Sequence, residues 1–358
     1  MANRPIALRL LAQGMAHSSF IHPEEVVRHF GCIQAQDAAG AAWAVALRTR
    51  RPSYTAFTES FKAGRVLCSH LLRCTWQFVA AEDYRTFLSV CAAVNRRLVT
   101  GYCASLGNRM DEVRLRRGGE RMARIVAEHG SIGRAELLRL AAVSGVTGDA
   151  HTLSCFLTVA EADGLICSGA WNGRKRTYAP LDSRVPQESP MGRDEALARL
   201  ALAFFRSHGP ATVADFAWWS GAGLAECRAA VADIGNAFCK VKFGNVEYLV
   251  ASDAKRCGTR KDTVHLLPAY DEWLIGYKDR SLVLPHRYAY RAHNNFGRFH
   301  PIVICGGVVV GNWRKATGRS AGQAVETDFF EPSMAPGDKA LKETVTRFVE
   351  FAEGEQKQ

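Results

Sequence analysis

The sequence predicts an α+β protein in which tandem winged-helix units are followed by a β-rich C-terminal module. Two observations lead to this fold class. The sequence pattern between residues 118 and 180 indicates three helices followed by a β-hairpin. The same pattern recurs between residues 193 and 252. Beyond Ser252 the helical spacing of apolar residues gives way to short extended runs. We therefore expect an N-terminal winged-helix unit (1–117), a second (118–185), a third (193–252) and the C-terminal module (253–358).

The second unit shows the pattern most clearly. Three helices are expected, at 120–129, from 133 or 134 onward, and at 152–163. Apolar residues recur in them at spacings of three and four, as on one face of a helix. Two extended runs follow, at 165–169 and 176–180. Asn172-Gly173 between these runs is typical of a hairpin turn, so the order is that of a winged helix.

The third unit repeats this order after a proline-containing linker at 182–192. A first helix spans 197–205, and Gly209-Pro210 breaks the chain after it. Thr212 is expected to cap a short second helix that ends at Trp218. The remaining elements are a third helix at 224–234 and a hairpin of the runs 238–243 and 246–251.

The two ends of the chain complete the prediction. Pro23 suits the first position of a helix that ends before Gly31. A long helix at 82–102 follows an extended run at 73–79. In the C-terminal module we expect strands at 264–267, 281–284, 302–305 and 308–313, and a helix at 338–352.

Composition and charge favour a globular DNA-binding protein. Of the 358 residues, 47% are hydrophobic and 23% are charged, which is ordinary for a globular chain. Lys and Arg number 46 against 35 Asp and Glu, a formal charge of +11 that favours a polyanionic partner. Apolar runs fall short of the roughly 20 residues of a membrane span. The amphipathic segment 1–11 lacks a cleavage site, so we expect neither a signal peptide nor membrane attachment.

Cysteine and histidine usage predicts no metal centre. The chain has 11 cysteines, an odd number, and no C-x-x-C pair. This usage favours reduced cysteines in a cytoplasmic protein. His293 and His300 flank a short polar stretch, but two histidines alone are a weak metal signal. We therefore expect neither a metal nor another cofactor.

Basic residues lie outside the helices that would read DNA bases. The third helices of both units present mainly acidic or neutral residues, so we interpret them as scaffold. They are Thr152, Ser154, Thr158, Glu161 and Asp163 in one case, and Glu226, Asp233 and a single Arg228 in the other. Arginines also cluster at 114–124. Aromatic residues such as Tyr277, Tyr288, Tyr290, Phe296, Phe299 and Trp313 alternate with basic ones, which favours a channel for the DNA backbone over a merely solvated surface. The candidate DNA-binding residues are Arg73, Arg174, Lys175, Arg176, Lys278, Arg280, Arg287 and Arg314.

A glutamine pair is the candidate catalytic feature. Gln34, Gln36 and Asp37 follow a helix stop and precede a run of small residues. In an extended segment Gln34 and Gln36 share one face, because the strand period is two. Two amides on one face can grip a water molecule and a sugar or base edge together. From composition alone, a surface loop is the competing interpretation.

Four segments resemble the AlkZ-like winged-helix DNA glycosylases. They are Ile33-Gln34-Ala35-Gln36 for the family's Gln-x-Gln motif, 73–76 (RCTW), 266–280 (LLPAYDEWLIGYKDR) and 307–314 (GVVVGNWR). The resemblance implies a C-shaped scaffold around duplex DNA and catalytic roles for Gln34 and Gln36. Where the family pattern has His after Thr-Trp, this chain has Gln77, which is left without a role.

The chemistry of alkylated purines agrees with the glutamine pair. Alkylation at N7 puts a positive charge on the base, so the base leaves without a general acid, and the sugar becomes oxocarbenium-like. Amide carbonyls can place water and stabilise this charge. Asp37 is a possible supporting base, and no lysine nucleophile is required, so we expect simple base hydrolysis.

The expected enzyme is thus a monomeric, monofunctional glycosylase for DNA with N7-alkylated purines or interstrand crosslinks. A hairpin near Arg174–Arg176 or near Gly307–Trp313 could enter a groove. Two alternatives remain open: a non-catalytic winged-helix regulator, and a resistance protein that shields lesions without turnover.

Overall fold

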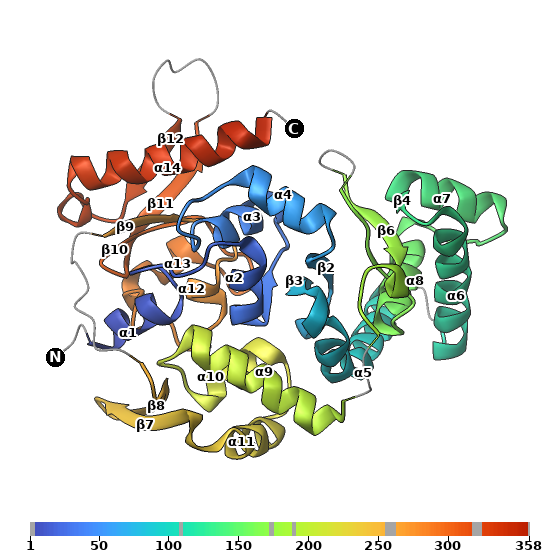
Figure 1. Cartoon of the computed structure of the whole chain (residues 1–358), viewed down its shortest axis with the longest axis horizontal. Helices are drawn as coiled ribbons and strands as arrows, with labels where there is room; N and C mark the ends of the chain where they lie inside the picture. Colours follow the sequence, from blue (N-terminus) through green and yellow to red (C-terminus); the bar gives the residue numbers. More distant parts are fainter. Residues whose placement is uncertain are drawn as a thin grey trace. The chain divides into compact units, whose positions relative to one another are not determined.

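The computed structural model describes residues 4–106, 110–171, 175–187, 191–254, 263–316 and 324–356. The chain divides into two compact units, one of Met1–Phe57 with Ala201–Gln358 and one of Thr58–Leu200. Their boundaries fall inside two continuous helices, α4 (Tyr54–Lys62) and α9 (Arg193–His208). Helices and short strands alternate in both units, which confirms the α+β class (Figure 1).

The first unit opens with four short elements: α1 (Arg4–Ala12), α2 (Pro23–Phe30), β1 (Cys32–Gln34) and α3 (Ala38–Ala46). The helix predicted after Pro23 is confirmed. Pro23 occupies its first turn, and the Glu25 carboxylate accepts the backbone N–H groups of Ile21 and His22. Gly31 ends the helix with φ of 77°, a value that favours glycine.

The predicted order of three helices and a hairpin is present from residue 193 to 251. Its elements are α9, α10 (Val213–Ser220), α11 (Leu224–Asp233), β7 (Phe238–Phe243) and β8 (Val246–Ala251). Thr212 caps α10 as predicted, since its hydroxyl accepts the N–H of Asp215. The β7 and β8 strands pair antiparallel across their full length.

The C-terminal part of the first unit is an antiparallel sheet in the order β12–β11–β10–β9. The strands are β9 (Val264–Leu267), β10 (Ile302–Cys305), β11 (Val308–Lys315) and β12 (Val325–Phe329). Two short helices, α12 (Glu272–Ile275) and α13 (Ala289–Ala292), lie between β9 and β10 in sequence, and α14 (Asp338–Gln356) closes the chain beside the sheet (Figure 1). The strand predicted at 281–284 is wrong: the carbonyl of Arg280 accepts the N–H groups of Val283 and Leu284 and closes a turn.

The turn between β10 and β11 is covered by α1. A Cβ atom built on Gly307 would lie 2.3 Å from Cγ2 of Ile6 and 3.1 Å from Cδ1 of Leu10. Helix and turn are thus in contact at Gly307; entry of this hairpin into a DNA groove stays a prediction.

The second unit contains a β-hairpin and a long helix, followed by the three helices and hairpin that were predicted between residues 118 and 180. Its elements are β2 (Val66–His70), β3 (Trp76–Ala80), α5 (Ala81–Ser105), α6 (Glu112–His129), β4 (Ile132–Gly133), α7 (Arg134–Val143), α8 (Ala150–Ala162), β5 (Ile166–Ser168) and β6 (Thr177–Pro180). The last strands form an antiparallel sheet in the order β4–β6–β5, as the predicted hairpin requires. Asn172-Gly173 lies outside the described residues.

The extended run predicted from Arg73 is wrong at its start. Arg73 and Cys74 adopt left-handed φ values of 55° and 56° in a tight turn, and β3 begins at Trp76. Such φ values are costly for side chains other than glycine. The turn is stabilised by hydrogen bonds from Asn95 to the carbonyls of His70 and Leu71.

Helix α6 is longer than predicted. It begins at Glu112 because the Asp111 carboxylate accepts the N–H of Arg114 at 2.7 Å. Gly118 and Gly119 lie inside it and permit close packing. A Cβ atom on Gly118 would come within 2.3 Å of the Phe156 ring on α8. The arginine cluster at 114–124 therefore lies on this helix.

Helix α8 is buried on nearly every side. The expectation that it displays Thr152, Thr158 and Glu161 is wrong, since these side chains are 4%, 8% and 1% exposed. The helix packs against α5 and α6, and Glu161 meets His70 of β2. Burial supports the interpretation of this helix as scaffold.

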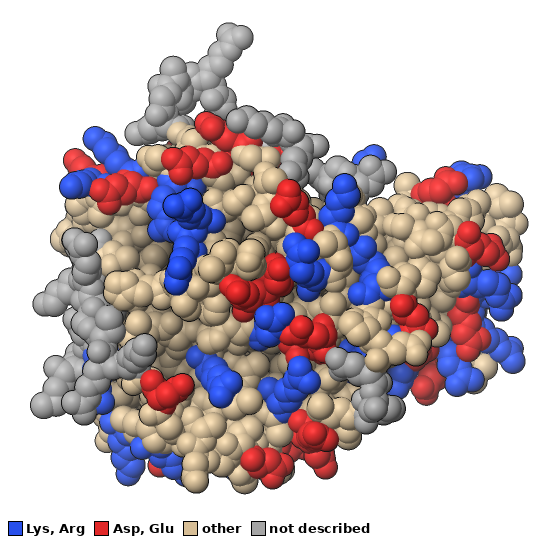
Figure 2. All heavy atoms as spheres, viewed as in Figure 1, with Lys and Arg blue, Asp and Glu red and all other residues tan. Residues whose placement is uncertain are grey.

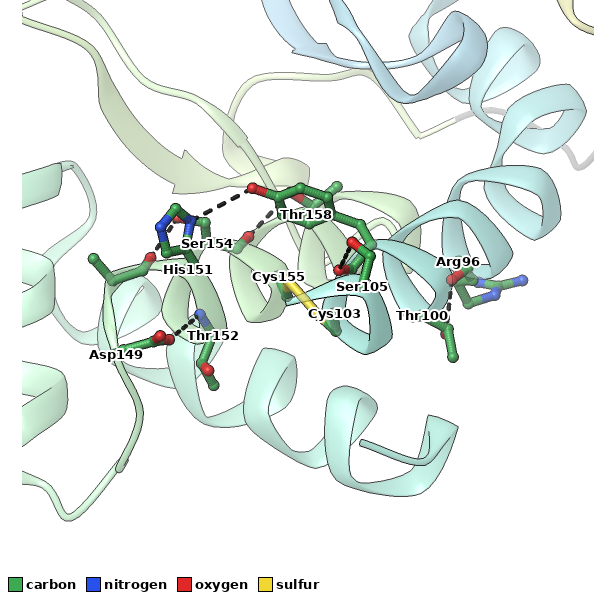
Figure 3. Close-up of a disulfide and its surroundings, with 12 residues drawn as sticks. Arg96, Thr100, Cys103, Ser105, Asp149, His151, Thr152, Ser154, Cys155 and Thr158 are labelled. Atoms are coloured by element: carbon green, nitrogen blue, oxygen red, sulfur yellow. Dashed lines mark hydrogen bonds between the residues drawn. A yellow bond between two sulfur atoms is a disulfide. The ribbon is translucent and has the colours of Figure 1, made fainter. Parts of the chain in front are cut away.

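Cys103 on α5 and Cys155 on α8 are joined by a disulfide in the structure (Figure 3). The expectation of fully reduced cysteines is therefore wrong for this pair. Other cysteines, such as Cys68, Cys91 and Cys167, are free and buried, and burial raises the pKa of each thiol to about 12.

Candidate active site

The glutamine segment links β1 to α3 in the first unit. Gln34 ends β1 and is 6% exposed, while Ala35 is fully buried. Gln36 lies beyond the strand and is exposed. Asp37 caps α3, where its Oδ1 accepts the N–H of Gly40 at 3.2 Å. The segment is thus extended at Gln34 and turns into a helix three residues later; a common direction for the two amides stays a prediction.

A buried carboxylate holds the strand that carries Gln34. The N–H of Gln34 donates to Oε1 of Glu272 at 2.7 Å. The other oxygen, Oε2, accepts Nε1–H of Trp219 at 2.9 Å and lies 3.2 Å from Nε2 of His208. Glu272 is 1% exposed. A buried acceptor with three partners fixes the backbone of Gln34 firmly.

The neighbouring residue of Glu272 anchors α3. Asp271 receives both NH groups of Arg48, at 2.8 and 2.9 Å, in a bidentate ion pair whose side chains are each 1% exposed. Arg48 also donates to the side chain of Gln13, and Gln13 lies 3.2 Å from the hydroxyl of Tyr277. Burial raises the pKa of Tyr277 far above its ordinary range, so the hydroxyl stays protonated and donates to the carbonyl of His208.

Sequence reasoning missed this network. Its members are Gln13, Arg48, His208, Trp219, Asp271, Glu272 and Tyr277. The available signal was the adjacent acid pair at 271–272 between apolar residues, because buried carboxylates need partners. Arg48 and Asp271 are 223 positions apart, so their pairing could not be read from spacing.

The candidate DNA-binding residues of the second unit lie near its hairpins. Arg176 stacks on the ring of Trp76 at 4.2 Å. Lys175 is exposed, and Arg73 is half-buried in the tight turn before β3. Arg174 lies outside the described residues. Gln77, left without a role, is buried, and its amide donates to Thr75.

The candidates of the first unit are mostly engaged within the protein. Arg280 donates to the carbonyl of Leu274 at 2.9 Å and lies over the rings of Trp218 and Phe299. Two others form ion pairs on the surface, Arg287 with Glu331 at 3.2 Å and Arg314 with Glu326 at 2.5 Å. Lys278 is exposed. On the face in Figure 2, basic side chains lie among acidic ones.

The aromatic set expected in a DNA channel is only partly accessible. Tyr277, Tyr288, Phe299 and Trp313 are 8% exposed or less. Tyr290 and Phe296 are 76% and 95% exposed and fit the expectation. Alternation with basic residues does not distinguish a core aromatic from a surface one, which explains the error.

A cluster of metal ligands or a membrane-spanning helix would point to other kinds of function. Within the described ranges, no group of three or more His, Cys, Asp or Glu side chains could hold a metal ion. Burial lowers the pKa of His293, which favours its neutral form. No helix in the described part of the chain is both long and apolar enough to cross a bilayer.

Comparison with known proteins places these features in a family. A family model described as DNA glycosylase AlkZ-like matches residues 27–351. The chain belongs to the AlkZ-like DNA glycosylase family. Membership indicates a DNA-repair glycosylase that binds DNA, and the matched region contains the glutamine segment, Arg48 and the acid pair at 271–272.

A solved structure shows the same fold. The DNA glycosylase AlkZ of Streptomyces sahachiroi superimposes with a TM-score of 0.79 and covers 98% of this chain and 96% of its own. The two sequences are 21% identical. A search of the curated proteins gives no match.

Proposed function

We propose that this AlkZ-like glycosylase hydrolyses the N-glycosidic bond of N7-alkylated purines in duplex DNA, with Gln34 and Gln36 as catalytic residues. The observation that carries the proposal is the bond from the Gln34 backbone to the buried carboxylate of Glu272. This anchor fixes the segment, while Gln36 and Asp37 face solvent where DNA can reach them.

The residues suit a substrate that already carries positive charge. An N7-alkylated base departs as a neutral leaving group, so the protein needs no general acid at the base. The amide oxygens of Gln34 and Gln36 stabilise the cationic sugar and orient the attacking water. Asp37 adds negative charge beside them. Amides are weak bases, so unmodified purines, whose glycosidic bonds are far less labile, should remain intact.

The proposed partner is duplex DNA, and the proposed lesions include crosslinks as well as single alkylated bases. The exposed Lys175 and Lys278, together with the half-buried Arg176, would contact phosphates of the duplex. Interstrand crosslinks through guanine N7 carry the same labile bond and belong to the same substrate class. The proposed enzyme is a cytoplasmic monomer that releases the base without cutting the strand.

The test is abasic-site formation on a duplex with one N7-methylguanine, followed by gel analysis after alkali. We expect Gln34→Ala and Gln36→Ala to lower the excision rate by about 100-fold or more each, as loss of one group that stabilises transition-state charge does elsewhere. DNA affinity should change less than about twofold. The matched control is Gln187→Ala, which removes an exposed glutamine elsewhere in the chain. Excision at the wild-type rate by the double variant would falsify the catalytic assignment.

A second substrate arm examines the lesion class. A duplex with an N7–N7 guanine crosslink should separate into single strands on denaturing gels after incubation. Strand cleavage without alkali would contradict the simple hydrolysis proposed here.

A further inference from the structure

The loop at 293–299 of the first unit presents an aromatic ring to solvent. It lies between α13 and β10 in sequence, and Phe296 stands midway along it. The Phe296 ring is 95% exposed, whereas Phe299 at the end of the same loop is 6% exposed. A phenyl ring left in water forgoes the hydrophobic gain of burial. The loop therefore buries one ring and offers the other to a partner.

The turn that carries Phe296 is held in one conformation by hydrogen bonds. Oδ1 of Asn294 accepts the N–H groups of Phe296 and Arg298, both at 3.0 Å. The N–H of Asn294 donates to the carbonyl of Arg298, also at 3.0 Å. Gly297 has φ of 79°, in the left-handed region that favours glycine. Because the turn is formed before a partner arrives, little ordering is needed when the ring is used.

The base of the loop is anchored beside the proposed catalytic segment. His293 and Phe299 form a β-bridge, and the Phe299 ring packs against that of Tyr270 with centroids 6.0 Å apart. Tyr270 lies two positions before Glu272, whose carboxylate accepts the N–H of Gln34. The loop and the glutamine segment are thus supported by the same stretch of chain.

A second contact limits how far the ring can lie from this segment. Pro301 and Asp37 line the same pocket, of about 230 Å³. Phe296 comes five positions before Pro301, and five residues span at most about 18 Å even when fully extended. Base pairs follow one another at roughly 3.4 Å along a duplex. The ring therefore lies within about five base-pair steps of this pocket.

The neighbours of Phe296 suit a DNA groove better than a protein surface. Asn295 and Arg298 on either side are exposed and polar. Protein-docking sites usually present a contiguous apolar patch of several hundred Å². A single apolar ring between Asn and Arg side chains is instead typical of proteins that enter a groove and separate two stacked bases.

We propose that Phe296 is a positioning residue that inserts as a wedge between stacked base pairs near the lesion. Insertion unstacks one step, while Asn295 and Arg298 contact the base edge and the phosphate beside it. The kinked step opens the deoxyribose to the glutamines without moving a base into a deep pocket. Insertion itself needs only the DNA binding that family membership indicates, whereas its effect on excision rests on the proposed function.

Insertion is measured by the fluorescence of 2-aminopurine, a base analogue that emits more strongly when it is unstacked. The duplex carries one N7-methylguanine on a 2′-fluorinated sugar, which keeps the base attached. The analogue is placed in turn at each of five positions on either side of the lesion. Wild-type protein should raise the emission about twofold or more at one step, and Phe296→Ala should abolish this rise.

Two further variants show that the ring acts as an apolar wedge. Phe296→Leu keeps an apolar side chain and should retain about half of the rise or more. The matched control is Val143→Ala, which shortens another apolar side chain, 76% exposed, and should give the wild-type rise. Each of these variants should keep the wild-type Tm, because the substituted side chains are mostly in solvent.

The excision assay gives a readout that a merely structural role would not move. With N7-methylguanine on an ordinary deoxyribose, Phe296→Ala should lower the excision rate at saturating protein about 10- to 100-fold, since unstacking is no longer assisted. Its affinity for the duplex should change less than about threefold, because phosphate contacts supply most of the affinity.

The outcomes separate this inference from the proposed function. No rise at any position, or an equal rise with Phe296→Ala, overturns the wedge even if excision depends on the glutamines. Loss of self-association by Phe296→Ala, without a change in emission, assigns the ring to a protein contact and also overturns it. The double variant of Gln34→Ala and Gln36→Ala should give the wild-type rise. Normal excision by that double variant would remove the catalytic proposal and leave the wedge in place.

Discussion

Two glutamates, one in each compact unit, are buried to the same extent but are satisfied differently. Glu272 of the first unit and Glu161 of the second are both 1% exposed. Both oxygens of Glu272 have partners, namely Gln34, Trp219 and His208. Glu161 meets Nδ1 of His70 at 2.5 Å, but its Oε1 has no hydrogen-bond partner within the described residues.

The difference indicates where the molecule is held most firmly. A buried carboxylate with all partners in place rigidifies its surroundings, whereas an unpartnered buried oxygen costs free energy. The first arrangement holds the strand of Gln34, and the second lies on α8, which we interpret as scaffold. Substitutions around Glu272 should therefore cost more stability than substitutions at Glu161, and they alone should disturb catalysis.

The largest effect is expected from Arg48→Met. The substitution leaves Asp271 buried without its bidentate partner, which should lower the free energy of unfolding by about 3–5 kcal/mol. Chemical denaturation measures the loss. The control is Arg139→Met, whose pair with Glu136 is on the surface and should be dispensable. If the two variants have the same free energy of unfolding, the buried pair of Arg48 and Asp271 does not hold the first unit more firmly than a surface pair does.

Low pH should lower the stability of the first unit because His265 of β9 becomes protonated. Burial, helped by the charges of Arg347 and Arg48, lowers the pKa of His265 from 6.5 to about 4. The folded state thus binds fewer protons than the unfolded state between these values. The neutral His265 contributes about 3 kcal/mol to the free energy of unfolding. This contribution is complete above pH 6.5 and is lost as the pH falls toward 4.

His265→Asn isolates this contribution, because the new side chain does not titrate. We expect the variant to be less stable at neutral pH but to lose less stability between pH 6.5 and 4 than the wild type. Denaturation at several pH values gives both slopes. Parallel curves would show that His265 does not drive the acid sensitivity.

Glu272→Gln should cost about 2 kcal/mol and slow excision. The amide keeps one acceptor but directs N–H groups at Trp219 or at the backbone of Gln34, and a buried donor then faces a donor. Denaturation gives the cost, and the abasic-site assay gives the rate. A purely structural role would lower stability without changing the excision rate of the folded protein, so the two readouts distinguish positioning from support.

Local signals in the sequence predicted much of the fold. Pro23 and Thr212 marked helix starts through backbone chemistry that acts within four residues, and both helices are present. Helix α6 starts earlier than predicted because the Asp111 cap sets its first turn and Gly118 lies inside it against Phe156. The apolar run at 281–284 was misread because a short buried turn and a short strand have the same composition.

The candidate site was predictable only in part. The glutamine segment stood out as an unusual pattern, and the family match covers it. Its anchor at Glu272 depends on a contact between residues more than 200 positions apart. Such contacts follow from tertiary packing, which periodicity and capping do not encode.

The smallest effect is expected at Glu161, where Glu161→Gln should change stability by less than about 1 kcal/mol, in either direction. The amide can still accept from His70, and a neutral group at the unpartnered position costs less to bury than a carboxylate. Excision should stay at the wild-type rate. The variant is the counterpart of Glu272→Gln, with the same atoms exchanged at equal burial. If the two variants lose the same stability, burial alone sets the cost; a larger loss at Glu272 shows that the completed set of partners does.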